Sequence, residues 1–212
     1  MREGSHQEAG HLVAVQPEFA GLIERIGPCT AVVERRELYA ALVRSIAHQQ
    51  LHGNAARAIL GRLVAHGGGV MPAPAPLAAI PDETFRGFGF SGGKTAAIRA
   101  IAAAALAGTI STLAEADGLD DEALIARLVT IRGVGRWTVE MLLMSTLGRP
   151  DILPIDDFGV REGWRLVTKA EVQLKPKALA AVGAAWAPYR STAAWYLWRA
   201  ADEGKKIKQT PL

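Results

Sequence analysis

The strongest constraint on the fold is a succession of helical segments that end at glycine or proline. Apolar residues recur at helical spacing from Leu38 to Leu63, with one break near Gly53. No run of alternating β-branched residues predicts a strand. We expect helices over residues 37–50, 54–65, 81–88, 92–106, 120–130, 136–147, 156–167, 176–186 and 188–202. The sequence therefore predicts an all-α protein with short connections.

Two stretches predict irregular structure. Residues 67–76 are rich in glycine and proline, which interrupt both helix and strand, so we expect a loop there. The basic tail from Gly204 onward is expected to fray.

Composition and charge exclude several classes of protein. A chain of 212 residues fits one domain or two closely joined lobes. The formal net charge of +3 permits a nucleic-acid partner without requiring one. Cys29 is the single cysteine, which excludes an intrachain disulfide and a cysteine-ligated iron–sulfur cluster. The polar N-terminus is unlike a signal peptide, and the apolar stretch 96–110 is too short to span a bilayer. We expect a cytoplasmic protein that is not bound to a membrane.

The most informative segment runs from Leu128 to Glu140. A helix is expected to end there, Gly133 and Gly135 make a tight hairpin, and a second helix begins. Glycines that adopt positive φ leave backbone N–H groups uncovered at a helix N-terminus, which suits a phosphate. Arg132 and Arg136 flank this cradle and add positive charge. The same two glycines also fit a plain turn between two helices.

The complete string Leu-Val-Thr-Ile-Arg-Gly-Val-Gly-Arg-Trp-Thr-Val-Glu resembles the helix-hairpin-helix motif of the DNA glycosylase superfamily. The resemblance implies that the hairpin binds the DNA backbone. It also implies that the main-chain carbonyls of Val129, Ile131 and Val134 hold a monovalent cation, Na⁺ or K⁺, that bridges to a phosphate. We expect no other cofactor.

A pair of aspartates follows the hairpin in the string Ile-Leu-Pro-Ile-Asp-Asp-Phe, residues 152–158. This string resembles the alkylbase glycosylases, in which the second aspartate is catalytic, so the resemblance assigns that role to Asp157. An ionised carboxylate near C1′ stabilises the positive charge that builds on deoxyribose, and it orients or deprotonates the attacking water. A place in the first turn of a helix favours that ionised form. Alternatively, Asp156 and Asp157 serve only as a helix cap and a first-turn residue.

Position 137 discriminates between two mechanisms. Relatives with lyase activity carry a lysine there, whose amine forms a Schiff base at C1′. Trp137 cannot do this, so hydrolysis by water is the expected chemistry.

A glycosylase must also flip its target nucleotide out of the stack and hold the base. Trp137 and Trp198 are candidate pocket walls, because electron-rich indoles attract cationic alkylated bases. Trp198 lies in a segment that resembles the C-terminal helix of the alkylbase glycosylases, whereas we expect Trp186 and Trp195 to be core residues. Further pocket or DNA-binding candidates in segments that resemble the family are Gln49, Gln50, His52, Phe88, Phe90 and Lys94. Surface polarity or an ordinary capped helix also accounts for these residues.

The resemblance covers about Leu38 to Trp198 and is to the DNA-3-methyladenine glycosylase II type, without the N-terminal sheet domain of some members. It implies two helical lobes, about 38–149 and about 1–37 with 150–212, and Asp157 at the mouth of a cleft between them. The implied function is excision of 3-methyladenine and 7-methylguanine from double-stranded DNA by a monomer, with an abasic site as product. The alternatives are a non-catalytic DNA-binding module and a glycosylase for another lesion.

Overall fold

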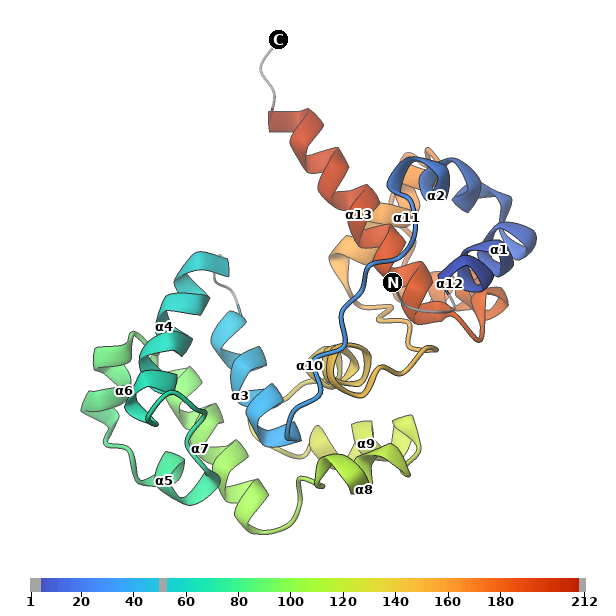
Figure 1. The fold of residues 1–212 in the computed structure, drawn as a ribbon. Helices are drawn as coiled ribbons and strands as arrows, with labels where there is room; N and C mark the ends of the chain where they lie inside the picture. The colour runs from blue at the N-terminus through green and yellow to red at the C-terminus, as the bar shows by residue number, and fades with distance from the viewer. Residues whose placement is uncertain (1–4, 50–52, 210–212) are drawn as a thin grey trace. The chain divides into compact units, whose positions relative to one another are not determined.

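The computed structural model describes residues 5–49 and 53–209, and within these ranges it contains helices and loops but no strand. The chain divides into two compact units, which we describe separately (Figure 1). Unit 1 consists of Met1–Val33 with Gly148–Leu212, and unit 2 consists of Glu34–Leu147. These boundaries lie a few residues from those expected for the two lobes. None of the helices in the described ranges combines the length and hydropathy needed to cross a bilayer.

Unit 2 is built from a continuous stretch of chain. Its helices are α3 (Leu38–His48), α4 (Gly53–His66), α5 (Pro74–Ala79), α6 (Asp82–Phe88), α7 (Gly92–Leu106), α8 (Leu113–Asp117), α9 (Asp121–Leu128) and α10 (Arg136–Leu142), which continues as the π-helical segment η2 (Leu143–Leu147). Helix α7 contacts α3 and α5, and α3 also contacts α4 and α10. The apolar faces of these helices form one core, which includes Leu42, Ile46, Leu63, Phe85, Ile98, Ile101 and Val139.

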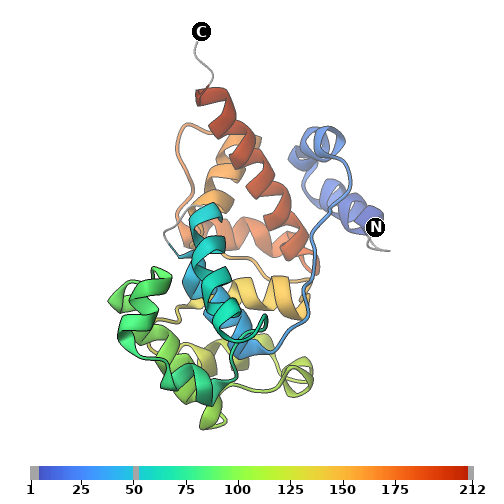
Figure 2. The ribbon, with the colours of Figure 1, turned by 60° about the vertical axis from the view of Figure 1, so that its left-hand side comes forward.

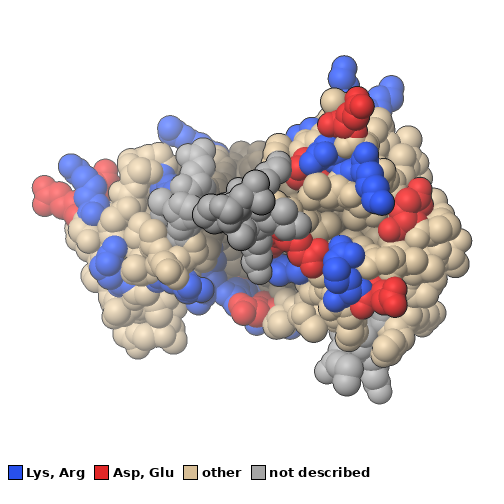
Figure 3. All heavy atoms as spheres, turned by 90° about the horizontal axis from the view of Figure 1, so that it is seen from above, with Lys and Arg blue, Asp and Glu red and all other residues tan. Residues whose placement is uncertain are grey.

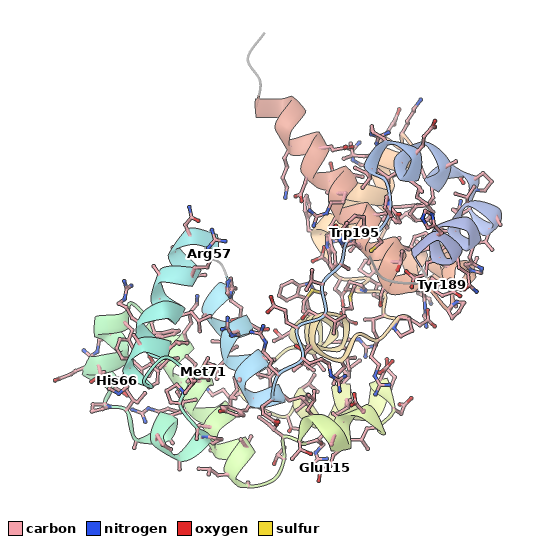
Figure 4. The ribbon with its side chains drawn as sticks, in the orientation of Figure 1. Arg57, His66, Met71, Glu115, Tyr189 and Trp195 are labelled. Carbon is pink, nitrogen blue, oxygen red and sulfur yellow. The ribbon has the colours of Figure 1, made fainter. Side chains whose placement is uncertain are left out.

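Side-chain caps fix where several of these helices begin. Ser91 accepts a hydrogen bond from the Lys94 backbone at the start of α7, and Asp120 accepts one from Ala123 at the start of α9. Both starts were predicted from the sequence. The short α8, which carries Glu115 (Figure 4), begins with a capping box that Glu115 forms with Thr112.

Unit 1 combines both ends of the chain. It contains α1 (Ser5–Val15), η1 (Pro17–Phe19), α2 (Ala20–Ile26), α11 (Phe158–Val167), α12 (Pro176–Gly183), η3 (Ala184–Trp186) and α13 (Arg190–Gln209). Helices α11 and α13 lie side by side, as Figure 2 also shows. The rings of Phe19, Trp164 and Trp186 pack together with centroids 5.1–5.9 Å apart. Trp186 is fully buried, which confirms it as a core residue.

Polar contacts hold the N-terminal helices to α13. The buried Tyr196 hydroxyl donates to the Gly27 carbonyl at 2.9 Å, and the Thr192 hydroxyl donates to Glu8 at 2.6 Å. Burial raises the pKa of Tyr196 to about 12.

Several predicted element boundaries were wrong. Pro74 begins helix α5 inside the expected loop, because proline is favoured at the first helical position and Leu77 is buried one turn later. Helix α13 continues to Gln209 instead of fraying at Gly204. At Gly204 a Cβ would lie 2.6 Å from Leu166 Cδ1, so the glycine permits close helix contact there. The short helices α1, α2 and α8 were not predicted.

Candidate active site

Asp157 occupies a fixed position at the start of α11. A tight turn precedes it, in which the Asp157 N–H donates to the Pro154 carbonyl at 3.0 Å. The carboxylate is the N-cap of α11, and its Oδ1 accepts the Val160 N–H at 2.8 Å. The sequence predicted a helix from residue 156 with Asp157 in its first turn. The helix instead begins at Phe158, and Asp156 is exposed outside it.

Trp198 contacts this same carboxylate from α13. Its indole Nε1–H donates to Asp157 Oδ1 at 2.9 Å, across 41 positions of sequence. Both side chains are half-buried. The structure therefore brings together Asp157 and Trp198, which the sequence had suggested separately as a catalytic residue and as a wall of the base pocket. Two N–H donors from different helices fix the orientation of one carboxylate oxygen.

The loop that leads to Asp157 is anchored to the first turn of α13. Arg190 forms a bidentate ion pair with Asp151, with Nε–Oδ1 and Nη2–Oδ2 distances of 2.7 and 2.9 Å. The buried Ser191 hydroxyl donates to the Arg149 carbonyl and accepts the Ile152 N–H. The hydrogen bond from Arg190 lowers the pKa of Asp151. Sequence analysis missed Arg190 and Ser191, because the contacts that define their role span about forty residues of sequence.

Trp195 (Figure 4) was expected in the core but is half-buried on α13. Its ring packs edge-on against Tyr196 and lies 5.3 Å from the Arg199 guanidinium. This residue therefore contacts its own helix neighbours at the edge of the core.

The hairpin in unit 2 has one glycine with positive φ, not two. Gly133 has φ of +85°, and a Cβ there would lie 2.6 Å from Ala97 Cβ on α7. Gly135 has φ of −95° as the N-cap of α10, which any residue adopts. A Cβ on Gly135 would meet no atom within 4 Å. The prediction of positive φ was therefore right for Gly133 and wrong for Gly135, where an added side chain would meet no neighbour.

The two hairpin arginines differ in their surroundings. Arg136 forms an ion pair with both oxygens of Glu122 on α9, and its Nε donates to the buried Glu140 at 3.0 Å. The Glu122 contact is the main reason that the pKa of Arg136 is raised. Arg132 is exposed, and within the described residues its guanidinium has no partner. Arg136 therefore joins the two helices of the hairpin, and the predicted phosphate contacts of both arginines stay predictions.

Gln49 lies beside α10, where its Nε2 donates to Thr138 Oγ1 at 3.4 Å. Thr138 directly follows Trp137, whose side chain is 42% exposed.

Lys94 makes a contact inside the protein that was not expected. Its half-buried ammonium donates to the Ala47 carbonyl near the end of α3 at 2.9 Å. Lys94 therefore joins α7 to α3, and its predicted contact with a phosphate stays a prediction.

The two phenylalanines near α6 also have different surroundings. Phe90 is 3% exposed and packs against Phe85, so it belongs to the core, and its predicted role in a base pocket stays a prediction. Phe88 is half-buried, and its ring contacts His66 at the end of α4 (Figure 4), with centroids 5.4 Å apart. The remaining candidates in this part of the chain, Gln50 and His52, lie outside the described residues.

The carbonyls of the candidate cation site belong to the hairpin turn. The side chains of Ile131 and Val134 are buried, which anchors the turn, and the Ile131 carbonyl accepts the Val134 N–H at 3.0 Å. A carbonyl oxygen has a second lone pair, so this bond leaves Ile131 compatible with a cation. The cation at Val129, Ile131 and Val134 stays a prediction.

Basic and acidic side chains are mixed on one face of the protein. On the face drawn in Figure 3, Lys and Arg side chains stand among Asp and Glu side chains instead of forming one continuous patch. Specific groups such as the hairpin backbone and Arg132 are therefore better candidates for phosphate contacts than the net charge is.

Comparison with known proteins agrees with this arrangement. The family described as HhH-GPD superfamily base excision DNA repair protein matches residues 43–188. DNA-3-methyladenine glycosylase 1 of Schizosaccharomyces pombe is 37% identical over 204 residues, which cover 93% of this chain and 90% of that protein. The solved structure of S. pombe 3-methyladenine DNA glycosylase (Mag1) in complex with abasic DNA has a TM-score of 0.84 and 36% identity, and the match covers 91% of this chain and 95% of that one. The crystal structure of DNA-3-methyladenine glycosidase from Bacillus halodurans has a TM-score of 0.83 and 33% identity, with 95% and 91% covered.

Proposed function

Because this chain belongs to the HhH-GPD superfamily of base excision DNA repair proteins, we propose that it is a monofunctional DNA glycosylase for alkylated purines. Its substrates are 3-methyladenine and 7-methylguanine in duplex DNA, and its product is an abasic site. The observation that carries the proposal is the Asp157 carboxylate, which is held by the N-terminus of α11 and by the Trp198 indole. The names of its relatives, DNA-3-methyladenine glycosylases, support the choice of substrate.

Asp157 supplies the negative charge that the reaction needs. Cleavage of the N-glycosidic bond leaves the electron pair on the base, so a cationic alkylated purine departs as a neutral molecule. Positive charge builds on the deoxyribose at the same time, and a fixed carboxylate close to C1′ stabilises it. Water then adds its oxygen to C1′, and its proton passes to Asp157 and on to solvent. A cationic base is already a good leaving group, so Asp157 needs no general acid as a partner.

The two tryptophans suit a positively charged base. The electron-rich face of an indole attracts a cation, and Trp198 is joined directly to the catalytic carboxylate. Trp137 offers a second, more exposed ring next to the hairpin. Trp137 has no amine, so the chain forms no Schiff base and does not cleave the abasic product.

The hairpin is the proposed contact with the DNA backbone. Gly135 leaves the N-terminus of α10 open to a phosphate, and Arg132 adds a positive charge beside it. A monovalent cation on the carbonyls of Val129, Ile131 and Val134 would strengthen this contact. The proposed form is a monomer that acts in the cytoplasm, and at the nucleoid if the source is a bacterium.

Release of free base from methylated duplex DNA tests the proposal. Wild type should release 3-methyladenine or 7-methylguanine, and Asp157→Asn should not, because asparagine keeps the shape but loses the charge. Both proteins should bind the DNA equally well. The abasic product should stay unnicked until alkali is added, and borohydride should trap no covalent complex.

Two results would contradict the proposal. Full activity of Asp157→Asn would show that another group carries the reaction. Release by neither protein, with DNA binding intact, would favour a different lesion or the non-catalytic DNA-binding module.

A further inference from the structure

We propose that Gly159 is a positioning residue for the candidate catalytic pair, because its missing side chain allows the Trp198 indole to reach the Asp157 carboxylate. This inference rests on the proposed function of Asp157. It assigns a role to a position that has no side chain of its own.

Gly159 lies between the two members of the pair. A Cβ at this position would lie 2.9 Å from Trp198 Cδ1 and 3.1 Å from Asp157 Oδ1. It would also lie 3.4 Å from the Trp198 Nε1 that donates the hydrogen bond. The methyl group of an alanine at position 159 would therefore be too close to both the Trp198 indole and the Asp157 carboxylate. At least one of them must move, and the 2.9 Å bond between them lengthens or breaks.

The need for glycine at this position is steric. Gly159 lies in the first turn of α11, and its φ is not in the positive region that favours glycine. Alanine therefore fits its backbone conformation. Alanine is also the better helix former in general. A fall in activity on Gly159→Ala would therefore reflect the contact with the pair and not backbone strain.

The helices on either side leave little room for the pair to adjust. Gly163 lies one turn further along α11, and a Cβ there would overlap the Leu197 carbonyl oxygen and lie 2.5 Å from the carbonyl carbon. The backbones of α11 and α13 thus touch directly beside Trp198. Leu197 and Val160 are fully buried in the same contact. Moving α13 away from a larger residue at 159 would open this buried interface, so the indole and the carboxylate are the groups that yield.

The test compares Gly159→Ala with Gly21→Ala, a matched control in unit 1. Gly21 is an exposed helical glycine at which a Cβ would meet no atom within 4 Å. We expect Gly159→Ala to slow base release by roughly tenfold to a hundredfold, the range typical of a small misplacement of a reacting group. DNA affinity should stay within about threefold of wild type, because the hairpin contacts are untouched. Gly21→Ala should match wild type in both measurements.

A spectroscopic readout separates positioning from a general loss of stability. The indole N–H resonance of Trp198, assigned from its disappearance in Trp198→Phe, reports the bond to Asp157 directly in ¹H–¹⁵N spectra of the full chain. Gly159→Ala should shift this resonance and speed its exchange with solvent, with the other tryptophan N–H resonances little changed. Asp157→Asn should shift it as well.

A double-mutant cycle keeps the inference testable if the single variant is poorly stable. In the Trp198→Leu background the indole is gone, so Gly159→Ala should cost much less activity than it does in wild type. An equal loss in both backgrounds would overturn the inference, as would an unchanged Trp198 resonance. If wild type released no base while Gly159→Ala still moved that resonance, the proposed function would fail and the positioning of the pair would be supported.

Discussion

Asp157 shows how a single side chain is fixed by groups from two helices. Its Oδ1 accepts one N–H from its own helix and one from Trp198 on α13. The hairpin arginines show the opposite case, because two residues of the same type in one motif have different roles. Both are exposed, but Arg136 is held by two carboxylates, whereas the Arg132 guanidinium has no partner among the described residues. Residue type and spacing do not distinguish these two arginines.

Separate replacement of the two arginines should have different effects. Arg132→Ala should weaken binding to any DNA sequence, with little change in stability. The plot of log binding constant against log salt concentration should become less steep by about the amount that one phosphate contact contributes. Arg136→Ala should lower the free energy of unfolding by roughly 1–3 kcal/mol, because it leaves the buried Glu140 without this ion pair. Salt-dependent DNA binding and thermal unfolding measure the two effects. Equal stability of both variants would contradict the assignment.

The hairpin glycines give a second matched pair. Gly133→Ala should destabilise the protein by about 1–3 kcal/mol, because it combines positive φ with a clash against Ala97. Gly135→Ala should fold normally but bind DNA more weakly, since its methyl group stands where a phosphate approaches the N-terminus of α10. Thermal unfolding and DNA affinity separate the two. Wild-type DNA affinity of Gly135→Ala would argue against a phosphate at this turn.

At the level of the elements, local capping explains why the starts of α7 and α9 could be predicted. Ser91 and Asp120 act through a backbone N–H three residues away, so the sequence itself contains the signal. The start of α11 was misplaced because two aspartates compete for the cap. The turn in which the Pro154 carbonyl accepts the Asp157 N–H places Asp157, and not Asp156, at the cap. The end of α3 depends on a residue of another helix, since Lys94 of α7 caps a carbonyl there.

Loss of the Lys94 contact should affect α3 more than it affects DNA binding in general. Lys94→Met keeps most of the side-chain volume but leaves the Ala47 carbonyl without the ammonium, at a cost of about 1–2 kcal/mol. Turnover should fall as well, because Gln49 directly follows α3. Nonspecific DNA affinity should fall less than it does in Arg132→Ala. A salt-dependent loss as large as that of Arg132→Ala would instead assign Lys94 to phosphate binding.

At the scale of the whole molecule, both ends of the chain build unit 1, and the central stretch builds unit 2. Asp157 and Trp198 belong to unit 1, whereas the hairpin, Trp137 and Gln49 belong to unit 2. The candidate residues therefore come from both units of the chain. The chain enters unit 1 for the second time at Gly148, and the Asp151–Arg190 ion pair immediately anchors it to α13.

This ion pair predicts a pH dependence of stability. Arg190 lowers the pKa of Asp151 in the folded protein, so the pair stabilises the fold above the unfolded pKa of about 3.9. That stabilisation is lost as the pH falls through the lower, folded value. The melting temperature of wild type should therefore drop more between pH 5 and about pH 3 than that of Asp151→Asn, which has no carboxylate to protonate. Parallel acid melting curves for the two proteins would contradict this role.

The sequence by itself determined the helical class, the hairpin, the starts of α7 and α9 to within one residue, and the choice of Asp157, Trp137 and Trp198 as candidates. Those signals are local, because helical periodicity, capping and a tight turn depend on residues within one or two turns of each other. Only the tertiary structure decided that Trp198 binds Asp157, that Arg136 and Lys94 serve internal contacts, that Phe90 is a core residue, and that Gly159 is confined between the members of the pair. These outcomes depend on which helix faces pack against each other. Helices that are far apart in the sequence come into close contact only in the folded protein, so no local sequence pattern predicts their contacts.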